Sequence, residues 1–301
     1  MKGGVDVDIT DAGSVERLRR KAITRHVFGR IGIYSVAVFA ALVAAFPFTW
    51  GFITAFKQDP DFYNVASNPF LWNLPPTTES VRYIFEQTQF LTFAANTLLV
   101  GGLVVLITLV VALPAAYSLA RLDVRWAGPL GIAIFLVYLV PPSLLFISLS
   151  KVVAELGLQD SKWSLVVIHP TITIPVSVWL LVGFFKGVPR DIEEQAMVDG
   201  FSRLAAFVRV GVPLVVPGVI AVVVFAFTLS TSEFIYALAF VSATAEKTVS
   251  VGVPTELVRG DVFFWQELQA AAILVAVPIA FVFSLFLDRF ISGFTMGAVK
   301  G

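Results

Sequence analysis

The sequence predicts an all-α protein that crosses a membrane six times and carries a charged, water-exposed loop between two of its spans. Of the 301 residues, 57% are hydrophobic and only 14% are charged, and the mean hydropathy of +0.87 lies outside the range of soluble domains. The apolar runs reach the roughly 20 residues that a helix needs to span a bilayer. They are also continuous, whereas the strands of a membrane β-barrel alternate over about ten residues.

The chain divides into a polar N-terminal segment (1–30), a membrane domain (31–290) and a C-terminal tail (291–301). No signal-peptide cleavage pattern follows the first apolar run, so this run is expected to be retained as a span. Between the first two spans, residues 81–86 are amphipathic and predict a short helix at the membrane surface. The six spans are expected at residues 31–56, 93–117, 130–149, 163–185, 214–232 and 268–287.

Prolines interrupt several of these runs. Pro141 and Pro142 stand in the middle of the third run, which predicts a kinked or broken helix there. Such breaks are tolerated where neighbouring helices or a cavity satisfy the freed carbonyl groups. Residues 231–238 are expected to continue the fifth span, and 241–265 to form a mixed loop before the sixth.

The distribution of basic residues orients the chain in the membrane. With six spans, both termini lie on one side, and cytoplasmic termini would place 15 of the 21 Lys and Arg residues inside. Because basic residues are enriched in cytoplasmic loops, the sequence predicts a multi-pass membrane protein with both termini in the cytoplasm. The charged loop at 189–213 is then cytoplasmic as well.

This loop is rich in charged residues. Eight ionisable side chains lie between Lys186 and Arg209, and burying them at the bilayer centre would cost on the order of 20 kcal/mol. Pro189 suits a helix start, Gly200 a left-handed helix end, and Ser202 the cap of a second helix. The residues alone leave two interpretations open: a solvated connector between spans, or a docking site for a soluble partner.

The spacing of residues in the loop resembles a known pattern. Glu194-Gln-Ala, followed by Asp199-Gly200 and, thirteen residues later, by Pro213, resembles the EAA loop of ATP-binding-cassette importer permeases. The family pattern is Glu-Ala-Ala, three residues, Gly, nine residues, then Ile-x-Leu-Pro. This chain departs from it with Gln195 for the first Ala, and with Val210 and Val212 for Ile and Leu.

Shorter motifs narrow the resemblance to the second membrane subunit of maltose-type carbohydrate importers. They are the Tyr-Ser-Leu-Ala-Arg stretch of 117–121, the Thr-Ser-Glu-Phe segment that begins at Thr231, and the C-terminal sequence 297–301. In the second motif, Thr-Ser replaces the Trp-Asn of the family, but Glu233 is kept. The resemblance covers the chain from about residue 90 to its end.

This resemblance implies a permease subunit of a binding-protein-dependent sugar importer, which forms half of the translocation path. The expected partners are a second, homologous permease subunit, an ATPase dimer that binds ATP and Mg²⁺, an extracytoplasmic solute-binding protein, membrane lipid and the sugar. No nucleic-acid partner is expected. The residues expected to couple the chain to the ATPase are Glu193, Glu194, Ala196, Asp199, Gly200, Arg203 and Pro213.

The chain itself carries no signature of an enzyme. It has no Gly-x-x-x-x-Gly-Lys-Ser/Thr phosphate loop, no cysteine, and only two histidines, which excludes a cysteine-ligated metal and makes a metal site or a bound cofactor unexpected. His169, beside Pro170, fits a buried, hydrogen-bonded packing residue better than a ligand. Polar residues that could line a sugar path, or else join helices by hydrogen bonds, are Asn96, Ser148, Ser177 and Glu233.

Two alternatives stay open at this stage. The same kind of transporter could carry a polyamine, a phosphonate or an amino acid. The chain could also be a membrane scaffold that recruits an ATPase without transporting anything, and reconstituted uptake would separate that role from a permease.

Overall fold

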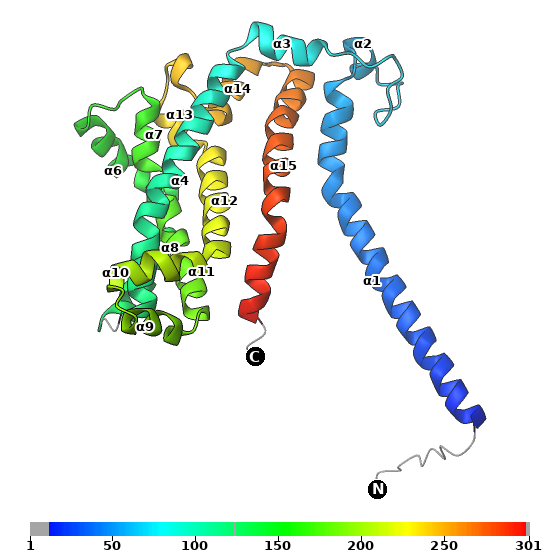
Figure 1. Ribbon diagram of the computed structural model, residues 1–301. Helices are drawn as coiled ribbons and strands as arrows, with labels where there is room; N and C mark the ends of the chain where they lie inside the picture. Colours follow the sequence, from blue (N-terminus) through cyan, green and yellow to red (C-terminus); the bar gives the residue numbers. More distant parts are fainter. Residues whose placement is uncertain (1–11, 123–124, 299–301) are drawn as a thin grey trace.

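The computed structural model describes residues 12–122 and 125–298, which are mostly helical (Figure 1). A two-stranded antiparallel hairpin pairs β1 (Val258–Arg259) with β2 (Val262–Phe263). A π-helical turn (Phe207–Gly211) joins α10 to α11. The helices are α1 (Ala12–Ala55), α2 (Asp59–Phe62), α3 (Glu79–Gln87), α4 (Phe90–Arg121), α5 (Ala127–Tyr138), α6 (Pro142–Glu155), α7 (Lys162–Ile168), α8 (Pro170–Gly187), α9 (Arg190–Val198), α10 (Arg203–Ala206), α11 (Val212–Leu214), α12 (Val216–Ser232), α13 (Ile235–Phe240), α14 (Val249–Leu257) and α15 (Trp265–Ala298).

Four helical segments of the described chain are long and apolar enough to cross a membrane: Gly29–Ala55, Phe90–Arg121, Trp163–Gly187 and Trp265–Phe286. Two further helix pairs meet this test only when their members are taken together. α5 and α6 turn by 95° across the double proline, and the segment Arg203–Leu214 meets α12 at 76°. Six spans are reached only if each bent pair crosses as one, so the number six stays a prediction.

The core of the bundle lies between α4, α8 and α12. Small residues of α4, such as Ala112 and Ala116, are fully buried, and Leu181 and Phe185 of α8 pack in the same cluster with Val222 of α12. Small side chains on one face let helices approach closely in a lipid environment, where packing rather than water exclusion drives their association. The predicted helical bundle is confirmed.

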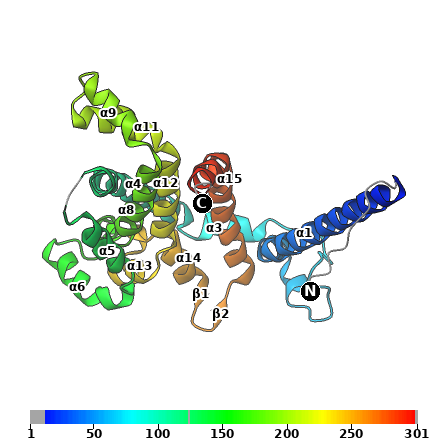
Figure 2. The same cartoon turned by 90° about the horizontal axis from the view of Figure 1, so that it is seen from below.

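α1 has a different environment from the other long helices. Residues 29–49 are exposed along their whole length, and α1 approaches the rest of the chain only towards its C-terminal end. There Gly51 faces Gln269 and Ile273 of α15. In Figures 1 and 2, α1 diverges from the bundle on the far side of α15. A span that is exposed over residues 29–49 in the single chain is suited to lipid or to another subunit.

The connecting segments gather at the two opposite ends of the bundle. α9, α10 and α11 form an elbow at one end, where α15 also ends, whereas α2, α3 and α14 lie at the other end (Figure 1). The amphipathic stretch 81–86 is helical as predicted, within α3, and Ile84 is buried beneath it. The expected tail 291–301 is helical as far as Ala298, where α15 ends, and its last three residues lie outside the described part of the chain.

One predicted continuation is wrong. The fifth span was expected to run on through 231–238, but α12 ends at Ser232 and α13 begins only at Ile235. The Glu233 carboxylate accepts hydrogen bonds from the backbone N–H groups of Tyr236, at 3.0 Å, and Ala237, at 3.1 Å. Glu233 therefore starts a new helix, because its side chain satisfies donors that a helix N-terminus leaves free.

Candidate functional site

The elbow consists of α9, α10, the π-helical turn and α11, and its sequence determines where its first two helices stop. Gly200 has a φ of +95°, in the left-handed region that glycine adopts without a steric penalty. Phe201 N donates to Ala196 O, and Gly200 N to Met197 O, each at 3.1 Å, which closes the end of α9. Ser202 Oγ accepts from Ala205 N and caps α10, so both sequence predictions are confirmed.

The elbow is joined to the bundle through an aromatic cluster. Phe207, in the π-helical turn, lies 4.6 Å from the Tyr117 ring of α4 and 6.3 Å from the Phe185 ring of α8, measured between ring centroids. Tyr117 and Phe185 are themselves in edge-to-face contact at 5.5 Å. Such pairs add to the stability that burial alone supplies. The second half of the elbow is therefore held directly against α4 and α8.

The seven residues expected to couple to an ATPase separate into two groups. Glu193 and Ala196 are buried against the rest of the chain, so they cannot be part of an exposed docking surface in this structure. The other five are exposed on the outside of the elbow: Glu194, Asp199, Gly200, Arg203 and Pro213.

The elbow also exposes apolar side chains that the sequence motif did not identify. Val198 is 85% exposed and Leu204 is 71% exposed, and Ile192 and Val208 are also open to the surroundings. We call these four residues the elbow patch. An apolar patch surrounded by charged residues is typical of a protein–protein contact site.

The predicted substrate-path residues have four different surroundings. The Asn96 side-chain amide of α4 donates to the backbone oxygens of Ala245 and Lys247, at 2.8 and 3.0 Å, so it anchors the loop before α14. Ser148 is exposed on α6, Ser177 is buried in α8, and Glu233 caps α13. The structure therefore does not bring the four together around one cavity.

A buried polar row on α8 connects two of these residues to groups that the sequence reasoning did not link. His169, Thr173 and Ser177 are four residues apart, and each is at most 1% exposed. His169 Nδ1 lies 2.8 Å from the hydroxyl of Ser230 on α12, as expected for a buried, hydrogen-bonded histidine. Its Nε2 lies 3.5 Å from Glu233 Oε2. The spacing along α8 was visible in the sequence, but the partner residues were not.

Thr173 and Ser177 continue this row along α8. The hydroxyls of Thr173 and Thr108 are 2.7 Å apart, which joins α8 to α4. Ser177 Oγ has no hydrogen-bond partner among the residues that the structure describes. The row thus joins α8 to both neighbouring helices, as polar side chains commonly do between membrane helices.

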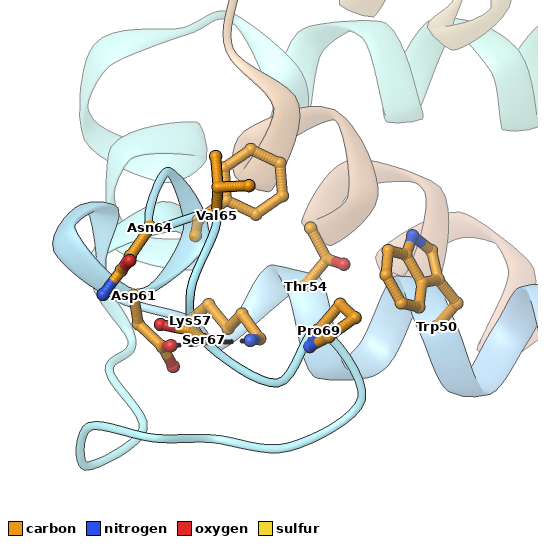
Figure 3. Close-up of a pocket in the computed structure, with 9 residues that line it drawn as sticks. Trp50, Thr54, Lys57, Asp61, Asn64, Val65, Ser67 and Pro69 are labelled. Carbon is orange, nitrogen blue, oxygen red and sulfur yellow. Dashed lines mark ion pairs between the residues drawn. The ribbon is translucent and has the colours of Figure 1, made fainter.

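At the opposite end of the molecule, the segment after α1 closes a small cavity of about 180 Å³ (Figure 3). Its charged groups are already paired with the same segment. Lys57 Nζ lies 3.6 Å from Asp61 Oδ1 and donates to Asn68 O, while Asn73 donates to both carboxylate oxygens of Asp61. Buried charges persist where they are paired in this way. We therefore interpret this cavity as the folded interior of the 57–75 loop.

Asp61 gives a test of this interpretation. Burial raises its pKa, but the hydrogen bonds from Asn73 and Leu74 and the charge of Lys57 outweigh that effect, so the pKa lies below its ordinary value of 3.8. The stabilisation is thus complete above that value and is lost as the pH falls through the lower, folded-state pKa. At neutral pH, we expect Asp61→Ala to speed amide hydrogen exchange of residues 57–75 by about tenfold. Unchanged exchange would show that Asp61 does not hold the loop.

Comparisons with known proteins identify the family of the chain. Residues 93–295 match the family described as binding-protein-dependent transport system inner membrane component. The chain is 32% identical to the sulfoquinovosyl glycerol transport system permease of Agrobacterium fabrum over 85% of this chain and 89% of that protein. It is 30% identical to the trehalose/maltose transport system permease of Thermococcus litoralis, over 91% of this chain and 98% of that protein. A third relative is the diacetylchitobiose uptake system permease of Streptomyces coelicolor, at 31% identity over 92% and 99%.

A solved structure has the same fold. It is the crystal structure of a bacterial ABC transporter involved in the import of the acidic polysaccharide alginate, and the match has a TM-score of 0.75. The match covers 89% of this chain and 98% of that one, at 17% sequence identity. At that identity, the likeness establishes the fold alone.

Proposed function

The chain belongs to the family of binding-protein-dependent transport system inner membrane components, and on that premise we propose that it is one of two permease subunits of a sugar importer. The family consists of membrane subunits of ABC importers, so the chain transports a solute and is not itself an enzyme. Hydrolysis of ATP, with its Mg²⁺, is assigned to a separate ATPase dimer.

The choice of a carbohydrate rests on the names of the relatives. Sulfoquinovosyl glycerol, trehalose, maltose and diacetylchitobiose are all sugars or glycosides, and each of these relatives aligns over at least 85% of this chain. A polyamine, a phosphonate or an amino acid is not favoured by any of them. These names differ in the sugar, so they support the class of solute and not one particular sugar.

We assign ATPase docking to the outer face of the elbow. Two observations support this assignment: the elbow patch is apolar and exposed, and it is surrounded by Glu194, Asp199 and Arg203. A centre of apolar residues with a polar rim is the usual composition of a specific contact. Closure of the ATPase dimer on ATP would move the elbow and shift the bundle between inward-facing and outward-facing states, which requires contacts that differ between the two states.

The other partners follow from the rest of the surface. The family implies a solute-binding protein, which we place at the end of the bundle opposite the elbow. We assign the second permease subunit to the sides of the bundle that are open in the single chain. One is the exposed length of α1, and the other is an apolar cavity of about 450 Å³ between α4, α12 and α15, lined by Leu98, Phe227 and Pro278 among others. Lipid would cover the remaining apolar surface of a protein in the bacterial inner membrane.

Within the bundle, Ser177 and Glu233 remain the proposed contacts for the solute. Ser177 has a buried hydroxyl without a partner in the described chain, and Glu233 is the acidic group next to the polar row of α8. Asn96 is better explained as a loop anchor, because its amide already donates to two carbonyl oxygens. Ser148 is exposed in the single chain and would reach a solute only from a surface shared with the second permease subunit.

The proposal is tested by reconstituting the chain with its second permease subunit, its ATPase and its binding protein in liposomes. We expect ATP-dependent accumulation of a sugar or a glycoside, and no accumulation of spermidine, a phosphonate or an amino acid. Uptake of one of these three instead would contradict the sugar assignment. ATP hydrolysis without accumulation of any solute would favour the scaffold alternative.

A further inference from the structure

We propose that Arg121 and Glu193 form a buried clamp that makes α9 move together with α4, so that Arg121 is a positioning residue for the coupling of ATP hydrolysis to transport. Arg121 is the last residue of α4, and Glu193 lies in the first half of α9, 72 positions later. The inference rests on the proposed function, because it concerns how the docked elbow passes motion to the membrane helices.

The clamp has two arms that start from one guanidinium group. Arg121 Nε donates to Glu193 Oε1 at 2.9 Å, and Arg121 Nη2 donates to the backbone oxygen of Val188 at 2.9 Å. The two side chains are 5% and 6% exposed, so water scarcely competes for either of them. Charge-assisted hydrogen bonds of this kind are shorter and stronger than neutral ones. One residue of α4 therefore contacts both α9 and the residue that ends α8.

A third contact runs in the opposite direction across the same junction. Arg190, the first residue of α9, donates from Nη2 to Ala120 O at 3.3 Å. Ala120 precedes Arg121 in the last turn of α4, where free carbonyl groups and a partial negative charge favour a cation. The end of α4 and the start of α9 thus exchange hydrogen bonds both ways.

Few residues of α9 face the bundle, and Glu193 is one of them. Of the nine residues of α9, only Glu193 and Ala196 are buried, and an alanine methyl group cannot reach far into the bundle. Glu193 also faces the second half of the elbow, because a Cβ on Gly211 would lie 3.6 Å from its Oε1 atom. The carboxylate accordingly lies between α4, the start of α9 and the π-helical turn.

This geometry has a mechanical consequence. The outer face of α9 is free to bind a partner, whereas its inner face is fixed by directional bonds to the end of a 32-residue helix, α4, that runs along the bundle. α4 in turn packs along α8 and α12. A displacement of α9 is therefore transmitted to the centre of the bundle and is not absorbed by a hinge at residues 188–190.

The experiment compares three variants in the reconstituted complex and measures ATP molecules hydrolysed per solute transported. The first variant is Arg121→Met with Glu193→Leu, because replacing both members of a buried ion pair with apolar groups of similar size preserves folding. We expect its ratio of hydrolysis to uptake to rise by about tenfold, while the ATPase still binds to the unchanged outer face. The second variant is Arg121→Lys, and we expect an intermediate ratio, because lysine keeps the charge but lacks the planar fork that reaches Glu193 and Val188 together.

The third variant is a matched control. Arg82 and Glu86 form an ion pair on α3 at the opposite end of the molecule, with the same N···O distance of 2.9 Å but with both side chains exposed. Because α3 lies at the end where we place the solute-binding protein, this control is read without that protein, and Arg82→Met with Glu86→Leu should leave the affinity for the ATPase and the basal rate of ATP hydrolysis unchanged. A wild-type ratio in the Arg121→Met/Glu193→Leu variant would overturn the clamp. If this variant does not assemble, Arg121→Lys decides, with a raised ratio in favour of the clamp and a wild-type ratio against it.

The design also separates the clamp from the proposed function. A wild-type complex that hydrolyses ATP without accumulating solute would refute the permease assignment itself. A wild-type complex that transports normally, together with clamp variants that do the same, would refute the clamp alone.

Discussion

Replacing Val198 with glutamate should weaken binding of the ATPase by about thirtyfold and reduce solute uptake accordingly, because the change places a charge in the elbow patch. Val198 is the most exposed member of that patch and ends α9, next to Asp199. Its side chain touches little of its own chain, so the variant should fold and insert normally. The measurement is the dissociation constant of the purified ATPase for the permease pair in detergent, followed by uptake in liposomes.

Val65→Glu is the matched control for this variant. Val65 is fully exposed in the loop after α1, at the end of the molecule opposite the elbow, so the same substitution introduces the same charge away from the proposed contact. It should leave ATPase binding unchanged. Wild-type binding in the Val198→Glu variant would show that the outer face of α9 is not where the ATPase docks.

The second large effect concerns stability. Gly252→Val should lower the free energy of unfolding by about 3 kcal/mol, because an added side chain at this position overpacks the contact between α14 and α4. A Cβ on Gly252 would lie 2.5 Å from the ring of Phe93, and that ring is fully buried. Since the ring has no open space into which it could rotate, the helices themselves would have to separate. Loss of the folded fraction on heating in detergent, followed by size-exclusion chromatography, measures the effect.

Gly102→Val tests whether the effect comes from the contact or from the loss of a helical glycine. Gly102 lies in α4, is exposed, and would have nothing within 4 Å of an added Cβ. Replacing it should leave stability within about 0.5 kcal/mol of the wild type. Equal losses in both variants would mean that the close approach at Gly252 is not a packing constraint.

Local structure was predictable wherever one residue determines it. Gly200 adopts the left-handed conformation, Ser202 caps the next helix, and the chain bends at Pro141-Pro142, all as the sequence indicates. Each of these outcomes depends on the backbone preference of a residue or on a hydrogen bond to a near neighbour. The family resemblance, carried by the residues of the 189–213 loop and by shorter motifs, was confirmed by the match over residues 93–295.

The contact of Glu193 that sequence reasoning missed depends on a distant partner. Nothing in the motif around Glu194 indicates that its neighbour Glu193 faces inward, because this requires Arg121 at the end of another helix. The turn at Glu233 was missed although its partners are close in the sequence. The apolar run continues past it, and only the carboxylate's position over two free N–H groups shows that a new helix begins.

The exposed length of α1 has a consequence for biogenesis. Residues 29–49 of α1 have no buried side, so this helix is compatible with lipid on all sides before any other helix is present. Helices of this kind insert independently and associate afterwards. This helix can therefore remain in the bilayer until a partner forms, and in the single chain its rotation is set at its C-terminal end, where Gly51 faces Gln269 and Ile273 of α15.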